Sequence, residues 1–294
     1  MRWNKVTLVG VGLLGGSLGL AIKRRRLARE VAGYVRRDTS VRECADAGAV
    51  DFATTDLLAA VWNADLVILC TPIAQMPPLV KRLLPALKHG AIVTDVGSAK
   101  SSVVKKLESR IARAGACFVG SHPMAGTEKT GVSAAQEDLF ESAICVVTPT
   151  RRTDPAALKK TERFWKSVGS QVMKLSPEDH DLLVSRSSHL PHIVAAALVN
   201  LVLSPSLPEE QQALCANGFR DTTRVASGSP EMWRDIALAN RTHLRVILDD
   251  FVRQLQRVQA LLREADADHL VQFFETAKRR RDAWCSGITC QSSE

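Results

Sequence analysis

Two clusters of polar residues stand out by their types and spacing. One spans Ser121–Lys129 with the sequence SHPMAGTEK, and the other combines SHLPH at Ser188–His192 with GFRDTTR at Gly218–Arg224. His122 follows an apolar run typical of a parallel strand, at the end where the crevice of such a sheet opens. A histidine there, with a pKa near neutrality, can take a hydroxyl proton while a hydride leaves the same carbon. We therefore expect His122 to be a general base.

The other histidines carry a weaker signal, because a single histidine is more often structural than catalytic. His89, His243 and His269 stand outside the polar clusters and are interpreted as structural or surface residues. His189 precedes Pro191 at a predicted helix start, which favours a structural role for its ring. Trp233 is interpreted as part of the scaffold.

A glycine-rich segment precedes these clusters in the chain. Gly10-Val11-Gly12-Leu13-Leu14-Gly15 follows a strand and opens a helix, the context in which GxGxxG indicates a dinucleotide site. The first glycine permits a tight turn, the second lets the backbone approach a pyrophosphate, and the third allows close packing of the helix. The amino-terminal N–H groups of that helix face the anion. The predicted cofactor contacts here are Gly10, Gly12, Leu13, Leu14, Gly15 and Thr71.

The choice of cofactor depends on the residue about 20 positions after the last glycine, which normally is an acid that binds the ribose. Here it is Val35, followed by Arg36 and Arg37. Paired guanidinium groups can bind a 2′-phosphate, so NADP or dual use is favoured over strict use of NAD. Two alternatives stay open: the arginines are merely solvated or stack on adenine, and Asp38 serves as a displaced ribose acceptor.

The first half of the chain alternates short apolar runs with helical patterns, as successive βα units do. Strands are predicted at residues 6–9, 31–35, 64–70, 91–95, 117–120 and 144–148. Helices are predicted at residues 16–26, 41–47, 75–87 and 100–114. We therefore predict an α/β fold with a Rossmann-type doubly wound sheet, a dinucleotide-binding domain of residues 1–150.

The second half of the chain is predicted to be helical. Side-chain caps stand directly before prolines, and so mark three helix starts, at Asp154-Pro155, Ser176-Pro177 and Ser229-Pro230. From Arg241 onward, apolar residues recur at steps of three and four up to Leu262, which predicts one long helix with an apolar stripe. The nearly all-apolar segment Leu190–Leu203 predicts a buried helix. Residues 151–282 are therefore expected to form an all-α substrate and dimerisation domain, and residues 283–294 a loose tail.

The predicted helices of this second domain have more apolar surface than a single helical bundle of its size would bury. We therefore predict a homodimer that is formed through these helices.

Composition narrows the class of protein. The 294 residues carry a net charge of +8, with 46% hydrophobic and 24% charged residues, values typical of a soluble globular enzyme rather than a disordered chain. Seven cysteines without a CxxC pair favour reduced thiols and no metal site. The basic runs are far apart and lack interleaved aromatic residues, which argues against nucleic-acid binding. The absence of a signal peptide or a 20-residue apolar run predicts a cytoplasmic protein without a membrane partner.

Several ordered motifs together resemble the prephenate and arogenate dehydrogenases of tyrosine biosynthesis. The resemblance covers about residues 5–282 and is carried by GVGLLGGSLG at Gly10–Gly19, DVGSAK at Asp95–Lys100, SHPMAGTEKTGV at Ser121–Val132, SHLPH at Ser188–His192, GFRDTTR at Gly218–Arg224 and SPEMWRDI at Ser229–Ile236. With no mutase segment before the glycines and too few residues for a regulatory domain after the helices, the chain resembles the monofunctional form.

The resemblance implies oxidative decarboxylation of a cyclohexadienyl substrate, prephenate or L-arogenate. Hydride passes from the hydroxyl-bearing ring carbon to NAD or NADP, and loss of CO2 makes the ring aromatic. It implies that His122 accepts the hydroxyl proton with help from Ser98, that Arg224 binds a substrate carboxylate and that His192 contacts the substrate. It further implies that Thr127 and Glu128 shape or gate the pocket. Arg220 and Asp221 are as readily a brace for their loop as substrate contacts.

Two other functions are weighed against this one. A β-hydroxyacid dehydrogenase also joins a nucleotide domain to a helical domain, but generally relies on a lysine of the second domain, whereas His122 and Arg224 fill the polar roles here. A nucleotide-sensing regulator without catalysis would have no reason to keep Ser98, His122, His192 and Arg224 together.

Overall fold

The computed structural model describes residues 2–127, 129–208 and 210–291. In this part of the chain eight strands form one sheet in the order β3-β2-β1-β4-β5-β6-β7-β8. The strands are β1 (Trp3–Val9), β2 (Ala28–Tyr34), β3 (Phe52–Thr54), β4 (Leu66–Leu69), β5 (Ile92–Asp95), β6 (Cys117–Pro123), β7 (Ile144–Thr148) and β8 (Gln171–Lys174). All neighbours are parallel except β6 and β7.

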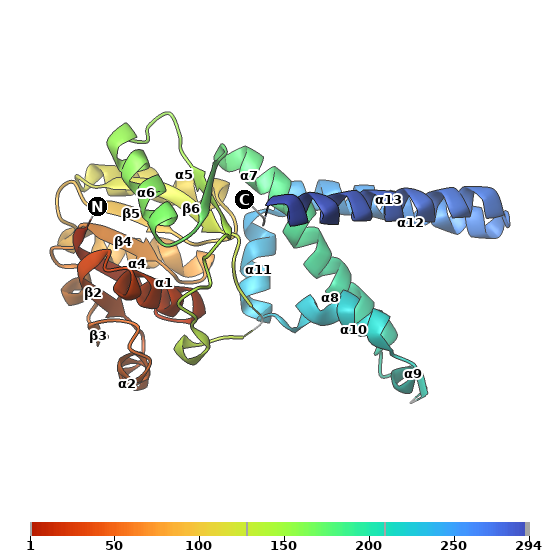
Figure 1. Cartoon of the computed structure of the whole chain (residues 1–294), viewed down its shortest axis with the longest axis horizontal. Coiled ribbons are helices and arrows are strands. Elements are labelled where there is room, and N and C mark those ends of the chain that lie inside the picture. Colours follow the sequence, from red (N-terminus) through yellow and green to blue (C-terminus); the bar gives the residue numbers. More distant parts are fainter. Residues whose placement is uncertain (1, 128, 209, 292–294) are drawn as a thin grey trace. The chain divides into compact units, whose positions relative to one another are not determined.

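The order of the first six strands is that of a doubly wound nucleotide-binding sheet, with the switch point between β1 and β4. Helices cover both faces of this sheet (Figure 1). Those of the first 170 residues are α1 (Leu13–Arg24), α2 (Asp38–Asp46), α3 (Leu57–Val61), α4 (Met76–Leu83), α5 (Ser101–Arg113) and α6 (Pro155–Ser167), with short 3₁₀ turns η1 (Ile73–Gln75), η2 (Leu84–Ala86) and η3 (Val132–Ala134). The predicted fold class is confirmed.

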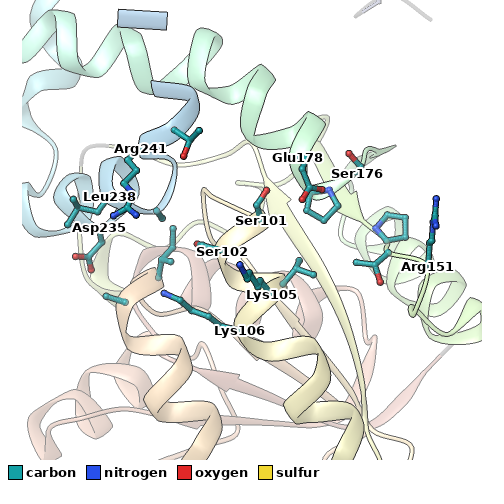
Figure 2. Close-up of a pocket in the computed structure, with 18 residues that line it drawn as sticks. Ser101, Ser102, Lys105, Lys106, Arg151, Ser176, Glu178, Asp235, Leu238 and Arg241 are labelled. Atoms are coloured by element: carbon teal, nitrogen blue, oxygen red, sulfur yellow. The ribbon is translucent and has the colours of Figure 1, made fainter. Parts of the chain in front are cut away.

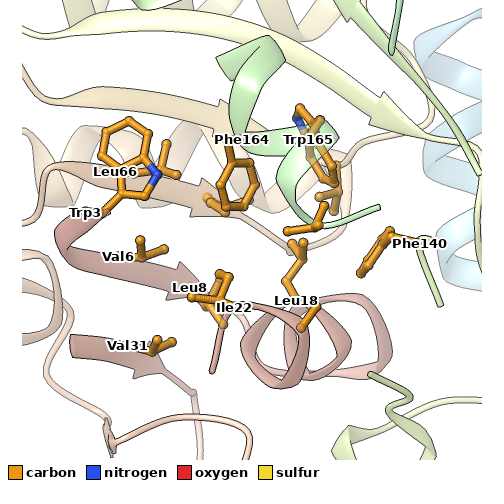
Figure 3. Packing of buried hydrophobic residues seen from close by; sticks show 14 of the residues in the cluster. Trp3, Val6, Leu8, Leu18, Ile22, Val31, Leu66, Phe140, Phe164 and Trp165 are labelled. Atoms are coloured by element: carbon orange, nitrogen blue, oxygen red, sulfur yellow. The ribbon is translucent and has the colours of Figure 1, made fainter. Parts of the chain in front are cut away.

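Two apolar cores lie on the two faces of the sheet, because successive strand side chains point to opposite sides. On β1, Leu8 belongs to the core that α1 and α6 cover, while Val9 belongs to the core under α3, α4 and α5. Figure 3 shows the first core, in which Phe140 and Phe164 pack edge to face against Trp165. Both cores hold the sheet rigid beneath the loops at its carboxyl edge.

The rest of the chain is helical. Its elements are α7 (Pro177–Val184), a π-helical turn η4 (Ser185–His189), α8 (Leu190–Val202), α9 (Glu210–Ala213), α10 (Asn217–Thr223), η5 (Arg224–Ser227), α11 (Pro230–Ala239), α12 (Arg241–Arg263) and α13 (Ala267–Gln291). The three predicted caps are confirmed: Asp154, Ser176 and Ser229 each accept the backbone N–H three residues on. The long helix predicted from Arg241 is confirmed as α12.

The chain divides into two compact units, residues 1–244 and residues 245–294. The sheet of the first unit continues past residue 150 through α6 to Lys174, so the expected division at 150 stays a prediction. The expectation of a loose tail from Ala283 is wrong as far as Gln291, because α13 continues to that residue. Gly287 is the one residue of 283–291 that strongly disfavours a helix, and a single glycine in a helix is tolerated.

The expectation that the apolar helix at 190–203 is buried is wrong for the single chain. Of the residues of α8 only Ala195 is buried, and Leu201 is 71% exposed. By length and composition alone the helical stretch Pro177–Val202 could cross a membrane. It also carries His180, Asp181 and His189, which are buried inside the first unit.

Candidate functional site

The glycine loop turns tightly between β1 and α1. Gly10 has a φ of +98°, in the left-handed region that favours glycine, and its N–H donates to the carbonyl of Tyr34 at 2.9 Å. A Cβ at Gly10 would lie 2.8 Å from the carbonyl oxygen of Cys70, and one at Gly15 would lie 2.0 Å from the carbonyl oxygen of Gly10. The packing of the loop against its surroundings therefore excludes a side chain at Gly10 and at Gly15.

The same loop leaves room for an anion where the first turn of α1 begins. A Cβ at Gly12 would meet no atom within 4 Å, and no side chain caps α1 or places an acid in its first turn, where Leu13 and Leu14 stand. Beside Gly10, the buried Oγ1 of Thr71 has no hydrogen-bond partner among the described residues. Free N–H groups, open space and an unpaired hydroxyl at the switch point fit a dinucleotide.

Arg36 and Arg37 lie beyond the end of β2 and are exposed, whereas Val35 is buried. Nη2 of Arg37 lies 3.4 Å from Oγ of Ser40, and Asp38 accepts a hydrogen bond from Thr55 at 3.2 Å. Both arginines thus follow the carboxyl end of β2, the place where an adenosine ribose binds in folds of this type.

His122 lies near the carboxyl end of β6 and is 6% exposed. Its Nδ1 lies 2.8 Å from Nε2 of His180, with the two rings packed edge to face. Nδ1 of His180 in turn lies 2.8 Å from Oδ1 of Asp181. His180 and Asp181 come from the first turns of α7, whose start is fixed by the Ser176 cap. The result is a line of three side chains, Asp181, His180 and His122, which we call the histidine relay.

Burial sets the charge states in the histidine relay. It lowers the pKa of His122 well below its ordinary value, and electrostatic interactions with His180, Lys100 and His189 lower it further. Burial also lowers the pKa of His180, although the hydrogen bond with Asp181 opposes this shift. Burial alone would raise the pKa of Asp181, but hydrogen bonds from His180 and two backbone N–H groups outweigh it and hold that pKa below its usual range. At neutral pH both rings are therefore neutral and the carboxylate is ionised.

A buried ion pair stiffens the strands around His122. Lys100 and Asp95 pair with both side chains fully buried, and Nζ of Lys100 also donates to the carbonyl of Ser121 at 2.7 Å. Asp95 accepts the N–H of Ser121 at 3.1 Å. This pair connects the end of β5 to β6 one residue before His122, so the histidine backbone is held in place.

Asp181 also connects α7 to α5. Its two carboxylate oxygens accept the N–H groups of Lys100 at 2.7 Å and Ser101 at 2.9 Å, donors that the start of a helix otherwise leaves unpaired. The loop before α5 carries Ser98, which is half-buried.

His189 occupies the π-helical turn η4 and is buried. Its ring lies next to the backbone of Ser98, and its Nδ1 lies 3.1 Å from Nδ2 of Asn240. Burial lowers the pKa of His189 to about 4. A neutral ring bound inside the fold is consistent with the structural role that the sequence favoured.

His192 and Arg224 are neighbours. His192, on α8, donates from Nδ1 to the carbonyl of Ser188 at 3.0 Å and stacks on Trp233 with ring centroids 3.6 Å apart. Burial lowers the pKa of His192, and the positive charge of Arg224 at the start of η5 lowers it further. Trp233, interpreted from sequence as scaffold, thus also supports His192 directly.

The structure therefore brings together four of the predicted residues, Ser98, His122, His192 and Arg224, through His189 and Trp233. Thr127 lies in the loop after β6, is exposed, and accepts the N–H of Lys129 at 3.2 Å. Glu128 lies outside the described residues.

Sequence reasoning missed His180 and Asp181. The adjacent His-Asp pair one turn into a helix marked by a Ser-Pro cap was the available signal. It lies 58 residues from His122, so nothing in the spacing connected the two.

A groove of about 1180 Å³ lies beside α5, between the starts of α5 and α7 and the end of α11 (Figure 2). Its cations include Lys105, Lys106 and Arg151, and its acids include Glu178. None of the predicted site residues that the structure describes lines this groove. Among the described residues no group of three histidine, cysteine or acidic side chains could hold a metal ion.

Comparison with known proteins gives concordant results over nearly the whole chain. Residues 18–174 match the family described as prephenate dehydrogenase, nucleotide-binding domain, and residues 176–276 match prephenate dehydrogenase, dimerization domain. A prephenate dehydrogenase of Bacillus subtilis is 37% identical over 95% of this chain and 76% of its own length.

Two solved structures are also similar. The prephenate dehydrogenase of A. aeolicus, in complex with hydroxyphenyl propionate and NAD+, is 36% identical with a TM-score of 0.89, over 96% of this chain and 98% of that one. The arogenate dehydrogenase of Synechocystis is 32% identical with a TM-score of 0.79, over 95% of this chain and 99% of that one. The chain therefore belongs to the prephenate dehydrogenase family.

Proposed function

We propose that this protein catalyses the oxidative decarboxylation of prephenate or L-arogenate with NAD or NADP, the dehydrogenase step of tyrosine biosynthesis. The observation that carries this proposal is the neutral, buried His122 at the carboxyl edge of the sheet that also presents the glycine loop. A neutral imidazole is the form that can accept a hydroxyl proton. Family membership and relatives at 32–37% identity support the same activity.

The chemistry divides among the residues of the site. His122 accepts the proton of the ring hydroxyl as hydride leaves the same carbon for the bound nicotinamide. The ring carboxylate then departs as CO2, its bonding electrons complete the aromatic ring, and the proton on His122 returns to the phenolate oxygen. Ser98, held in the loop before α5, assists by hydrogen bonding to the same hydroxyl.

Substrate binding falls to residues around the histidine relay. Prephenate is a dianion, and the planar fork of Arg224 is suited to one of its carboxylates. His192, fixed by Ser188 and Trp233, contacts the substrate beside Arg224. Thr127, from the loop after β6, and Glu128 shape or gate the pocket.

The cofactor would be held by the glycine loop, with Thr71 and the first turn of α1 at its phosphates. The missing acid at Val35 and the exposed Arg36 and Arg37 favour acceptance of NADP. The relative from A. aeolicus contains NAD+. We therefore propose use of NADP alone or of both cofactors, and a strong preference for NAD with NADP almost unused would contradict this proposal.

A direct assay tests the activity. Purified protein is mixed with prephenate or L-arogenate and each cofactor in turn, and reduced nicotinamide is followed at 340 nm. We expect turnover with at least one of the four combinations, and the ratios of kcat/KM rank the substrates and cofactors. Nucleotide binding without turnover in every combination would favour a nucleotide-sensing regulator instead.

We further propose that the protein is a homodimer. Of the residues of the apolar helix α8, only Ala195 is buried in the single chain, and residues 176–276 match a dimerization domain. An apolar helix face of this extent needs a covering surface, and a second copy supplies one. Free thiols are found at Cys44, Cys70, Cys117, Cys145 and Cys215, which is consistent with a location in the cytoplasm.

A further inference from the structure

The histidine relay has a direction that follows from the chemistry of its members. We propose that Asp181 and His180 fix the ring tautomer of His122, so that Nδ1 carries the hydrogen and Nε2 is left as the proton acceptor. His180 and Asp181 are then positioning residues, which act on the substrate only through His122. The assignment of the tautomer stands on the hydrogen bonds together with the ionised Asp181 and the neutral His180, whereas its catalytic consequence rests on the proposed function.

The direction starts at Asp181, because an ionised carboxylate can only accept hydrogen bonds. Nδ1 of His180, 2.8 Å from this carboxylate, must therefore carry the hydrogen. A neutral imidazole has one N–H, so Nε2 of His180 bears a lone pair and must accept. Its partner at 2.8 Å, Nδ1 of His122, must then be the donor. Nε2 of His122 is left unprotonated and free to act as a base.

The carboxylate at the origin of the relay is held in place. Both of its oxygens accept backbone N–H groups at the start of α5, from Lys100 and Ser101. Asp181 is 1% exposed, so water does not compete for these contacts. The side chain thus cannot rotate away from His180 without leaving two buried N–H groups unpaired.

The relay also offsets an otherwise unfavourable charge environment. His122 faces the positive Lys100 from the start of α5 and the neutral His189 from η4, while His180 faces Lys100, Asp181 and Asp95. When His122 takes a proton, its Nδ1–H donates more strongly to His180, and His180 is polarised by Asp181. A proton on His122 is therefore stabilised through His180, although none of the described acids contacts His122 directly, by the same logic as a triad carboxylate that acts through its histidine.

Nuclear magnetic resonance tests the tautomer without any assay of activity. Protein labelled with ¹⁵N-histidine is recorded near pH 7.5, and the signals of His122 are identified by their loss in His122→Asn. We expect a protonated Nδ1 and an unprotonated Nε2 in the wild type. A hydrogen on Nε2 of His122 would overturn the proposal, even if the enzyme turned over prephenate as proposed.

Substitutions test the catalytic consequence. In His180→Phe the ring shape is kept and both hydrogen bonds are lost, so we expect kcat to fall by roughly 10²-fold or more while the substrate KM changes little. His180→Gln, which can offer an oxygen to His122 and an N–H to Asp181, should recover part of that loss. His89→Gln, at an exposed histidine, is the matched control and should leave kcat unchanged.

The pH profile separates positioning from mere support of the fold. Without the relay the protonated form of His122 is less stabilised, so the acid limb of kcat/KM in His180→Phe should move to lower pH. Asp181→Asn should shift the His122 signals toward a protonated Nε2, because an amide can donate to Nδ1 of His180 and reverse the relay. Folded variants with unchanged His122 signals and an unmoved acid limb would contradict the proposal.

Discussion

At the scale of single residues, the site combines a neutral base with a fixed cation. Burial and the nearby charge of Lys100 keep the ring of His122 neutral, and Arg224 lies beside His192. The first supplies a proton acceptor that is ready at neutral pH, and the second supplies charge for an anionic substrate. Substitutions at these two positions should therefore change different kinetic constants.

His122→Asn should lower kcat by roughly 10²–10⁴-fold, because general-base catalysis contributes about this much. Binding should be much less affected, since asparagine keeps a polar side chain of similar reach. Steady-state kinetics with prephenate measure both constants. Equal turnover in the variant would end the assignment of His122 as the base.

Arg224→Ala should chiefly raise the substrate KM, by roughly 10- to 150-fold, since a charge-assisted hydrogen bond is worth about 1.5–3 kcal/mol. Arg234→Ala is the matched control, because Arg234 is exposed and pairs with Asp235 on its own helix. The KM for the cofactor should stay the same in both variants. A change confined to cofactor affinity would contradict the role of Arg224.

The buried histidines should make the free energy of unfolding depend on pH. His122, His180, His189 and His192 all have pKa values below those of the unfolded chain. At acid pH the unfolded chain therefore binds more protons, so stability is complete above about pH 6.5 and is lost as the pH falls. Losses from carboxylates with lowered pKa values, such as Asp181, begin only at lower pH.

His189 alone, with a pKa of about 4, accounts for a loss of roughly 2 kcal/mol between pH 7.5 and pH 5. Urea unfolding at the two pH values measures the total loss, which should be smaller in a folded His189→Asn variant. Stability that did not change between pH 7.5 and pH 5 would show that these rings are not held neutral by the fold.

At the scale of elements, the glycine loop shows how backbone geometry prepares a site. At Gly15 there is no space for a side chain, whereas the space around Gly12 is open among the described residues. The sequence motif predicted both roles, because each follows from the absence of a side chain at a fixed place in a βα turn. Substitutions at Gly12 and Gly15 can therefore separate effects on folding from effects on cofactor binding.

Gly12→Ala should leave the free energy of unfolding within about 0.5 kcal/mol of the wild type, because its Cβ meets no protein atom. It should weaken nucleotide binding by about tenfold or more, because the methyl group fills the space that a pyrophosphate needs. Gly15→Ala should instead lower stability by about 1–3 kcal/mol or more through overlap with Gly10. Urea unfolding and nucleotide titration distinguish the two variants, and equal effects of both would contradict the proposed cradle.

Some elements could not be predicted from sequence, for identifiable reasons. β3 has only three residues and α3 only five, too few to show a period. β8 is a mostly exposed edge strand whose sequence, QVMK, lacks a clear alternation. The strands β1, β2 and β4 to β7 and the helices α1, α4 and α5 were found, because their buried faces impose the apolar period that the sequence displays.

The same limit applies to the site. Ser98, His122, His192 and Arg224 were chosen from motifs, and the structure gathers them. His180 and Asp181 were not chosen, because their relation to His122 exists only after α7 packs against the sheet. Tertiary packing of this kind leaves no local pattern in the sequence.

At the scale of the whole molecule, the exposed apolar helix α8 is the feature that a single chain does not explain. Light scattering at micromolar concentration should give the mass of a dimer, about twice 32.0 kDa. Leu201→Glu should shift the protein toward monomer, because Leu201 is a large exposed apolar side chain on α8. Trp62→Glu, at an exposed apolar residue far away in sequence, is the control and should not. A monomeric wild type would contradict the dimer.

Asp181 accepts two hydrogen bonds from backbone N–H groups at the start of α5. These two N–H groups therefore report directly on the packing of α7 against the sheet. Amides in the first turn of a helix usually exchange quickly with deuterium, since they lack partners within the helix. The amides of Lys100 and Ser101 are instead bonded to a side chain about 80 residues away in the chain. Their exchange rates should therefore follow the opening of the α7 contact rather than the fraying of α5. Slow exchange at these two positions would mark an assembled site, and its loss would mark separation of α7 before the sheet itself unfolds.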